Sequence, residues 1–259
     1  MIFESHAHYD DEAFEEDREK LLESLKENGI EYVINIGASI QTTANTIALT
    51  KKYPFIYGAA GVHPSDTAEL NEEKFAWLKE QCFLPKIVAV GEIGLDYYWD
   101  EPDRETQKKW FDRQLQMARE VELPIIIHSR DAAKDTVDMM KAGGAEEVGG
   151  VIHCFSYTKE TAREFLAMGF SFGIGGVITF NNAKKLREAV EYIPMENILL
   201  ETDSPYLAPM PYRGKRNSSL NLPLIAEKIA EVKGISYEEV VETTARNAKR
   251  LFFKEKGEG

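Results

Sequence analysis

The sequence predicts an α/β protein, a (β/α)8 TIM barrel with additional C-terminal helices, built as a single domain over residues 1–259. Eight short apolar runs rich in Val and Ile are spread along the chain, and helical patterns separate them. Continuous apolar runs of this kind are typical of parallel strands that are covered on both faces. In addition, all five histidines fall where a predicted strand ends, which favours a closed ring of strands whose ends meet.

The elements follow one another in strict alternation. The strands are predicted over residues 2–6, 31–36, 55–60, 86–92, 124–128, 150–153, 170–174 and 197–202. The first helix begins at Arg18 and stops at Asn28-Gly29, where glycine suits the C-terminal capping position. The other helices are predicted over 41–52, 71–81, 106–121, 131–141, 158–168, 182–192, 221–233 and 236–252. The tail 254–259 is expected to fray.

An open, doubly wound sheet is the alternative fold. In such a sheet, ligands collect at the one point where the strand order reverses. The candidate site residues here end six different strands, and only a closed barrel brings six strand ends together.

Charge and composition narrow the classes of function. The net charge is −13 and the sequence pI is near 5.0, which disfavours extensive non-specific binding along a DNA duplex. A small pocket for a strand end or a short anionic substrate remains open, because bound cations can supply the missing positive charge.

The N-terminal segment, the apolar runs and the cysteines predict a cytoplasmic protein. No basic segment followed by an apolar run opens the chain, so no secretory signal is expected. The longest apolar runs are about five residues, short of the roughly 20 that a membrane span needs. Two cysteines, Cys82 and Cys154, lack the spacing of a disulfide framework. No membrane association and no obligate protein partner are implied.

Imidazole and carboxylate groups mark the strand ends. His6 and His8 close the first strand, and their two-residue spacing points both rings to the same side. The further candidates are His63 after the third strand, Glu92 at the end of the fourth, His128 of the fifth, His153 of the sixth and Asp203 of the eighth. Singly, each residue has an ordinary structural explanation, such as a satisfied core histidine. As a set at one end of a barrel, they predict a metal site.

The ligand types indicate hard or borderline divalent ions, with Mg²⁺, Mn²⁺ or Zn²⁺ expected. Four histidines (His6, His8, His128 and His153) and two carboxylates exceed what one ion needs, so two cations are expected, on the order of 3.5–4 Å apart. Such a pair activates a water molecule for phosphodiester or amide hydrolysis. Glu92 lies between glycines that leave room for a bridging carboxylate, and Asp203 can bind metal and accept a proton from the water. Glu201 is assigned a structural or supporting role.

Basic and aromatic residues near these strand ends are candidate substrate contacts. Arg213, Lys215 and Arg216 form a basic cluster in the loop after the eighth strand, and Arg130 is close to His128. They can receive phosphates or simply belong to a solvated surface. Tyr97 and the two aromatics after it can stack bases or pack the loop.

Assembled in order, these stretches resemble the TatD family of metal-dependent deoxyribonucleases, a branch of the amidohydrolase superfamily. The resemblance covers essentially the whole chain. The matching stretches are Ser5-His-Ala-His8, Gly61-Val-His-Pro64, Val90-Gly-Glu-Ile-Gly-Leu-Asp96, Pro124-Ile-Ile-Ile-His-Ser-Arg130, His153-Cys-Phe-Ser156 and Glu201-Thr-Asp-Ser-Pro-Tyr-Leu-Ala-Pro209.

The resemblance implies that one metal is held by His6, His8, Glu92 and Asp203, and the other by Glu92, His128 and His153. It implies that Asp203 acts as general base and that His63 contacts substrate rather than metal. The sequence departs from the family pattern at two places. Glu4 stands where the family usually has Asp, and Asn217-Ser-Ser-Leu stands where it usually has Arg-Asn-Glu-Pro.

Three functions from different classes therefore remain in view. The first is a nuclease that cleaves DNA, single-stranded or at strand ends, through a water activated by two metals. The second is an amide, ester or lactone hydrolase acting on a small molecule, which the acidic surface favours. The third is a barrel that binds without catalysis. It is disfavoured because a cluster of unpaired histidines and carboxylates is costly to keep.

Overall fold

The computed structural model describes residues 1–253. Its eight strands form one sheet in the order β1 to β8 and alternate with helices, so the fold is the predicted (β/α)8 barrel with additional C-terminal helices. The expected frayed tail, 254–259, lies outside the described residues. The chain divides into two compact units, and the expected single domain stays a prediction.

The strands lie close to their predicted limits. They are β1 (Ile2–Ala7), β2 (Ile30–Ile36), β3 (Ile56–Ala60), β4 (Ile87–Asp96), β5 (Ile125–Arg130), β6 (Gly150–Ile152), β7 (Ser171–Ile174) and β8 (Ile198–Leu200). The fourth and fifth strands run further than predicted because they stay paired as far as Asp96 and Arg130. The eighth ends earlier, so the prediction that Asp203 ends a strand was wrong: Asp203 lies three residues beyond β8.

The helices also lie close to their predicted limits. They are α1 (Arg18–Glu27), α2 (Ile40–Lys52), α3 (Glu72–Gln81), α4 (Arg104–Glu120), α5 (Ala133–Ala142), α6 (Lys159–Ala167), α7 (Lys184–Tyr192), α8 (Leu222–Lys233) and α9 (Tyr237–Phe252). Side chains of Ser39, Asn71, Asp103 and Ser236 accept backbone N–H bonds at four of the helix starts. Among residues 1–253, no helix combines the length and the apolar character needed to cross a bilayer.

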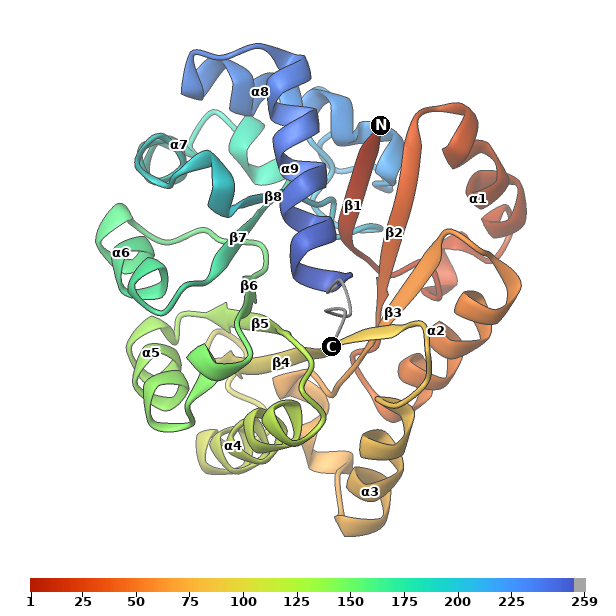
Figure 1. Ribbon diagram of the computed structural model, residues 1–259, viewed down its shortest axis with the longest axis vertical. Helices are drawn as coiled ribbons and strands as arrows, with labels where there is room; N and C mark the ends of the chain where they lie inside the picture. The colour runs from red at the N-terminus through yellow and green to blue at the C-terminus, as the bar shows by residue number, and fades with distance from the viewer. Residues whose placement is uncertain (254–259) are drawn as a thin grey trace, which may run out of the picture. The chain divides into compact units, whose positions relative to one another are not determined.

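The first unit comprises Met1–Asn35, Cys154–Leu166 and the chain from Ser171 onward. In it, α9 packs against both β1 and β8 (Figure 1). The buried Asn247 of α9 donates to the carbonyls of Met195 and Ile198 at distances of 2.7 and 2.9 Å. These bonds satisfy backbone groups at the start of β8 that a purely apolar helix face would leave unpaired.

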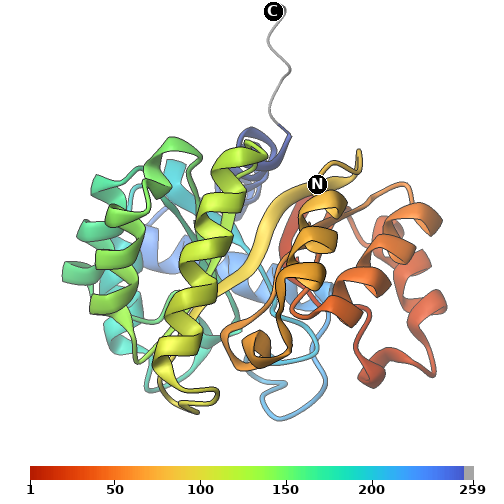
Figure 2. The same ribbon diagram turned by 90° about the horizontal axis from the view of Figure 1, so that it is seen from below.

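The second unit comprises Ile36–His153 and Ala167–Phe170. The neighbours among strands β3 to β6 pair in parallel, and α4 packs along β4 (Figure 2). Two buried glutamines of α4 bind the backbone of strand ends. Gln107 accepts from the N–H of Asp96 and donates to its carbonyl, and Gln114 does the same for Val62. The helix thereby holds the backbone next to His63, a candidate site residue, and the backbone of Asp96 itself.

Replacing Gln114 by leucine is expected to destabilise the protein by about 2–5 kcal/mol. The N–H and C=O groups of Val62 would both lose their partner, and each buried unpaired group costs about 1–3 kcal/mol. Thermal unfolding should show a lower Tm, by at least about 5 °C. The matched control is Gln116→Leu on the exposed side of the same helix, which should melt close to wild type. Equal melting temperatures for the two variants would contradict this role of Gln114.

The thiol of Cys82 is expected to resist thiol reagents while the protein is folded. Burial raises its pKa from 9.0 to about 12, so little of the reactive thiolate forms at pH 8. The unfolded thiol ionises first, so the stability that this group supports is full below pH 9 and is lost as the pH rises towards 12. A Cys154→Ser variant should label slowly when native and rapidly in denaturant. Equally rapid labelling in both states would overturn the prediction.

Candidate metal centres

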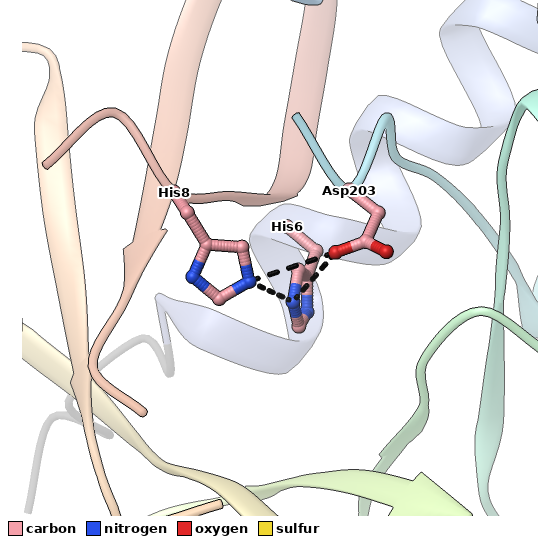
Figure 3. A group of neighbouring side chains, drawn as sticks. All are labelled: His6, His8 and Asp203. Atoms are coloured by element: carbon pink, nitrogen blue, oxygen red, sulfur yellow. Dashed lines mark hydrogen bonds and ion pairs between the residues drawn. The ribbon is translucent and has the colours of Figure 1, made fainter. Parts of the chain in front are cut away.

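Three of the predicted ligands meet in the first unit. His6 and His8 lie at the end of β1, and Figure 3 shows both rings turned toward the carboxylate of Asp203. The Nε2 atoms of the two histidines are 3.2 Å apart, and Oδ1 of Asp203 lies 3.6 Å from His6 Nε2 and 3.5 Å from His8 Nε2. All three groups are largely buried, with side-chain exposures of 1%, 14% and 15%. Three ligand atoms therefore face one point.

The backbone after β8 carries Asp203 to this point. The Asp203 N–H donates to the carbonyl of His6 at 3.0 Å, and the His8 N–H donates to the carbonyl of Ser204 at 2.7 Å. Asp203 has a φ of 56°, in the left-handed region, which aspartate tolerates better than most residues. The turn thus joins the ends of β1 and β8, which lie about two hundred residues apart in sequence.

The separations of these atoms fit a metal ion. Ligands bound at about 2.0–2.2 Å in a tetrahedron lie about 3.3–3.6 Å from one another. The observed separations of 3.2, 3.5 and 3.6 Å are close to these edges. Two imidazoles and one carboxylate make a donor set that suits zinc or manganese better than magnesium.

A buried polar network lies behind this cluster. The carboxylate of Glu4 is fully buried and accepts bonds from the backbone of His6, from Thr202 and from the Ser219 hydroxyl. Burial raises the pKa of Glu4 to about 7, although these hydrogen bonds counteract the effect. Glu4, where the family pattern usually has Asp, thus contacts the backbone of His6 and ties β1 to the segment after β8.

Asn217 is a further buried polar residue that supports Asp203, and the sequence alone does not predict this role. Its side chain is buried and donates to the carbonyls of Thr202 and Tyr206, at 2.9 and 2.8 Å. These two carbonyls flank Asp203, so Asn217 holds the turn that presents it. Its position beside a family motif was visible in the sequence, but its partners depend on how the loop folds back.

Glu201, for which a structural or supporting role is expected, is buried and contacts the backbone. Its Oε1 accepts the backbone N–H of Cys154 at 2.6 Å, within the first unit. A Cβ atom on Gly173 would lie 1.9 Å from the other carboxylate oxygen, so only glycine leaves room for this side chain.

The other ligand group lies in the second unit. Oε1 of Glu92, on β4, is 2.8 Å from Nδ1 of His128, which lies on β5, and 2.7 Å from Nε2 of His153, which follows β6. The two imidazole nitrogens are 3.3 Å apart, close to a tetrahedral edge. The two contacts of Glu92 are hydrogen-bond distances. Three of the predicted ligands therefore converge here as well.

His128 lies between two carboxylates, because its Nε2 is 3.1 Å from Oδ2 of Asp96. Burial lowers the pKa of His128, but the hydrogen bonds to Asp96 and Glu92 outweigh it and raise the pKa to about 9. For Asp96, burial favours the neutral acid, yet the bond to His128 and two backbone N–H groups lower its pKa. Asp96 ends one of the stretches that resemble the family, but it is not among the predicted site residues. The signal was its strand spacing, four residues after Glu92 and on the same face.

His63 lies beside this group. Its Nε2 is 3.8 Å from Oε1 of Glu92, and its ring lies at 4.2 Å from that of His128. The backbone N–H of Ser65 donates to Nδ1, which leaves the hydrogen of the neutral ring on Nε2. Burial lowers the pKa of His63 to about 3, so the ring is neutral. The expected role of His63 as a substrate contact stays a prediction, and its ligand atom also lies within 4.8 Å of those of Glu92 and His128.

The aromatic residues after β4 differ in their contacts and in their exposure to solvent. Tyr97 donates its hydroxyl to Asp135 at 2.7 Å, and the guanidinium of Arg104 covers its ring at 4.1 Å. Tyr98 and Trp99 are instead exposed, at 55% and 64%. Arg130 stacks on the ring of Tyr98 at 3.8 Å. The exposed surface next to Arg130 therefore comes from the two aromatics that follow Tyr97.

The basic residues in the loop after β8, which belong to the first unit, also differ in their contacts. Arg213 and Lys215 are exposed, and Arg213 stacks on Phe180 at 4.4 Å. Arg216 is bound to both carboxylate oxygens of Asp17, at 2.7 and 2.6 Å. A hollow of about 710 Å³ runs along this loop, and Tyr206, Lys215 and Arg216 are among the residues that line it.

Known proteins resemble this chain in sequence and fold over nearly its full length. A family model described as TatD related DNase matches residues 3–253. The uncharacterized metal-dependent hydrolase YabD of Bacillus subtilis is 45% identical and the match covers 97% of this chain and 99% of YabD. The 3'-5' ssDNA/RNA exonuclease TatD of Rahnella sp. is 32% identical, over 92% of this chain and 93% of its own. The crystal structure of the TatD homologue YJJV of Escherichia coli matches with a TM-score of 0.92 at 29% identity, over 97% of this chain and 98% of that one.

Proposed function

This chain belongs to the TatD family of metal-dependent hydrolases, and on that premise we propose that it is a deoxyribonuclease that cleaves phosphodiester bonds at the end of a single strand. The observation that carries the proposal is the convergence of His6, His8 and Asp203, whose ligand atoms are separated by metal-site distances. The name of the Rahnella relative, a 3'-5' ssDNA/RNA exonuclease, supports a nucleic-acid substrate attacked from its 3' end.

Each ligand group takes one divalent cation in this proposal. His6, His8 and Asp203 hold one, and Glu92, His128 and His153 hold the other. When bound, such cations lower the pKa of a water molecule and neutralise charge on the phosphate. The bridging role expected for Glu92 stays a prediction, which the metal content of its variants tests.

The protein's own side chains move protons and bind phosphate. Asp203, with 15% of its side chain exposed, takes the proton from the attacking water as general base. His63 is neutral and donates from Nε2 to a phosphate oxygen of the substrate. Arg130, Arg213 and Lys215 supply further positive charge, and Tyr97 supports the loop that presents the aromatics for stacking.

The acidic surface is compatible with this substrate if only a strand end enters. A net charge of −13 repels a duplex laid along the protein, but a few terminal nucleotides meet the local positive charge of two cations and the exposed arginine and lysine. The same acidity is the observation that favours the second function, hydrolysis of an amide, ester or lactone.

A labelled oligonucleotide tests the proposal. The protein is loaded with Zn²⁺, Mn²⁺ or Mg²⁺ and mixed with single-stranded DNA labelled at its 5' end. A ladder of shortened products is expected, and the same strand with a blocked 3' end should survive. A chelator should stop the reaction. Hydrolysis of small amides or lactones without any cleavage of oligonucleotides would replace the proposal by the second function.

A further inference from the structure

We propose that Asp96 is a positioning residue that keeps the hydrogen of His128 on Nε2 and so makes Nδ1 the atom that binds metal. This role requires the metal-binding part of the proposed function and is independent of the substrate. It assigns a task to a buried carboxylate that none of the predicted ligand sets contains.

The carboxylate of Asp96 is fixed in one orientation. Only 2% of its side chain is exposed. Its Oδ1 accepts the backbone N–H groups of Tyr98 and Trp99, at 2.9 and 3.2 Å. The backbone of Asp96 is held by the amide of Gln107 on both its N–H and its carbonyl. The remaining oxygen, Oδ2, is therefore left in a fixed position, and it faces Nε2 of His128 at 3.1 Å.

This contact decides which nitrogen of His128 keeps its hydrogen when a cation binds. Nε2 faces the carboxylate of Asp96 and Nδ1 that of Glu92, so without a cation both nitrogens can carry a hydrogen. A cation held by Glu92 would replace the hydrogen on Nδ1, while Asp96 keeps the one on Nε2, so the lone pair of the neutral ring is then on Nδ1. Nδ1 is the atom that faces Oε1 of Glu92 at 2.8 Å and Nε2 of His153 at 3.3 Å. The lone pair thus points at the place where the other two ligands converge.

His128 differs in this respect from the other predicted ligand histidines of the described chain. His6, His8 and His153 all turn Nε2 toward their ligand partners. A carboxylate behind a metal-binding imidazole is a recurrent device that fixes the ring and raises its basicity. At His128 the supporting carboxylate must contact Nε2, because Nδ1 is the nitrogen that faces the other ligands.

The variant Asp96→Asn reverses the hydrogen-bond pattern without changing the shape of the side chain. The two backbone N–H groups hold the amide oxygen where Oδ1 was, which turns the NH₂ group toward His128. The ring must then accept at Nε2 and carry its hydrogen on Nδ1, where the metal should bind. Affinity for Cd²⁺ or Zn²⁺ at the site of His128 should fall by about 10–100-fold.

Asp96→Ala separates this role from a merely structural one. Alanine leaves space for a water molecule, which can accept from Nε2 and so permits the correct tautomer. Metal affinity should therefore fall less in Asp96→Ala than in Asp96→Asn. If Asp96 only supported the loop, alanine would be the more damaging change. Asp135→Asn removes a nearby carboxylate that does not contact His128, and it should keep wild-type affinity.

The decisive measurement is NMR of the protein loaded with ¹¹³Cd. Coupling through three bonds reaches only the Hε1 proton when Nδ1 binds the metal, but both Hε1 and Hδ2 when Nε2 binds. We expect the first pattern for His128 and the second for His153. Both protons of His128 coupled in the wild type, or Asp96→Ala weaker in affinity than Asp96→Asn, would overturn the proposal. If the NMR pattern holds but oligonucleotides are not cleaved, the proposed function fails and the role of Asp96 stands.

Discussion

Replacing Glu92 by glutamine is expected to lower the rate of DNA cleavage by more than about 100-fold while leaving the protein folded. Glutamine keeps the shape of the side chain but removes the negative charge. The carboxylate oxygen that faces His128 Nδ1 and His153 Nε2 becomes either a neutral oxygen or an NH₂ group, and neither holds a cation well. The side chain is 5% exposed, so bulk solvent contributes little to offset the lost charge.

Two measurements check this expectation. Single-turnover cleavage of a 5'-labelled strand gives the rate, and elemental analysis gives the number of cations per chain. Because Glu92 is expected to bridge, its variant should lose metal from both ligand groups. The melting temperature should stay within a few degrees of wild type. Glu105→Gln, on a side chain that is 89% exposed, serves as the control. Cleavage by Glu92→Gln at the wild-type rate would refute the proposed mechanism.

Replacing Asp203 by asparagine should be at least as damaging, with an expected loss of about 10²–10⁴-fold in rate. The variant loses both the proton acceptor and one of the three ligands that meet His6 and His8. The turn itself should persist, because its bonds to β1 are made by backbone groups. Asparagine also tolerates the left-handed conformation that Asp203 adopts at φ 56°.

The metal content distinguishes this variant from the preceding one. Asp203→Asn should lose the cation of the first unit and retain that held by Glu92, His128 and His153. Asp17→Asn, which removes an exposed carboxylate paired with Arg216, should keep wild-type cleavage and metal content. An Asp203→Asn protein with two cations and normal cleavage would show that neither role belongs to Asp203.

Much of the fold could be predicted because the signals are local. A run such as Ile125-Ile126-Ile127 identifies a covered strand wherever it occurs, and Asn28-Gly29 ends a helix without help from distant residues. The errors arose where distant segments interact. β4 continues to Asp96 because β5 remains paired with it, whereas β8 stops at Leu200 because the following backbone bonds to His6 and His8 instead.

In the candidate site, too, features set by local sequence could be predicted, whereas contacts between distant segments could not. The positions of histidines and carboxylates at or just after strand ends predict both ligand groups, since parallel strands bring their ends to one face. The hydrogen-bond partners of the supporting residues could not be predicted in this way. Asp96, Gln107, Gln114 and Asn217 act through hydrogen bonds to groups up to fifty-two residues away along the chain, and nothing in the local pattern of a buried amide names its partner.

By itself, the sequence determined the alternation of strands and helices, the set of metal-type side chains and the family to which they are similar, because residue type and periodicity are properties of short segments. Only the tertiary structure decided which atom of each side chain faces its neighbours. That choice depends on register and on bonds between distant segments, so the orientation of His128, the partners of Glu4 and the unequal use of the aromatics after β4 emerged only from the folded chain.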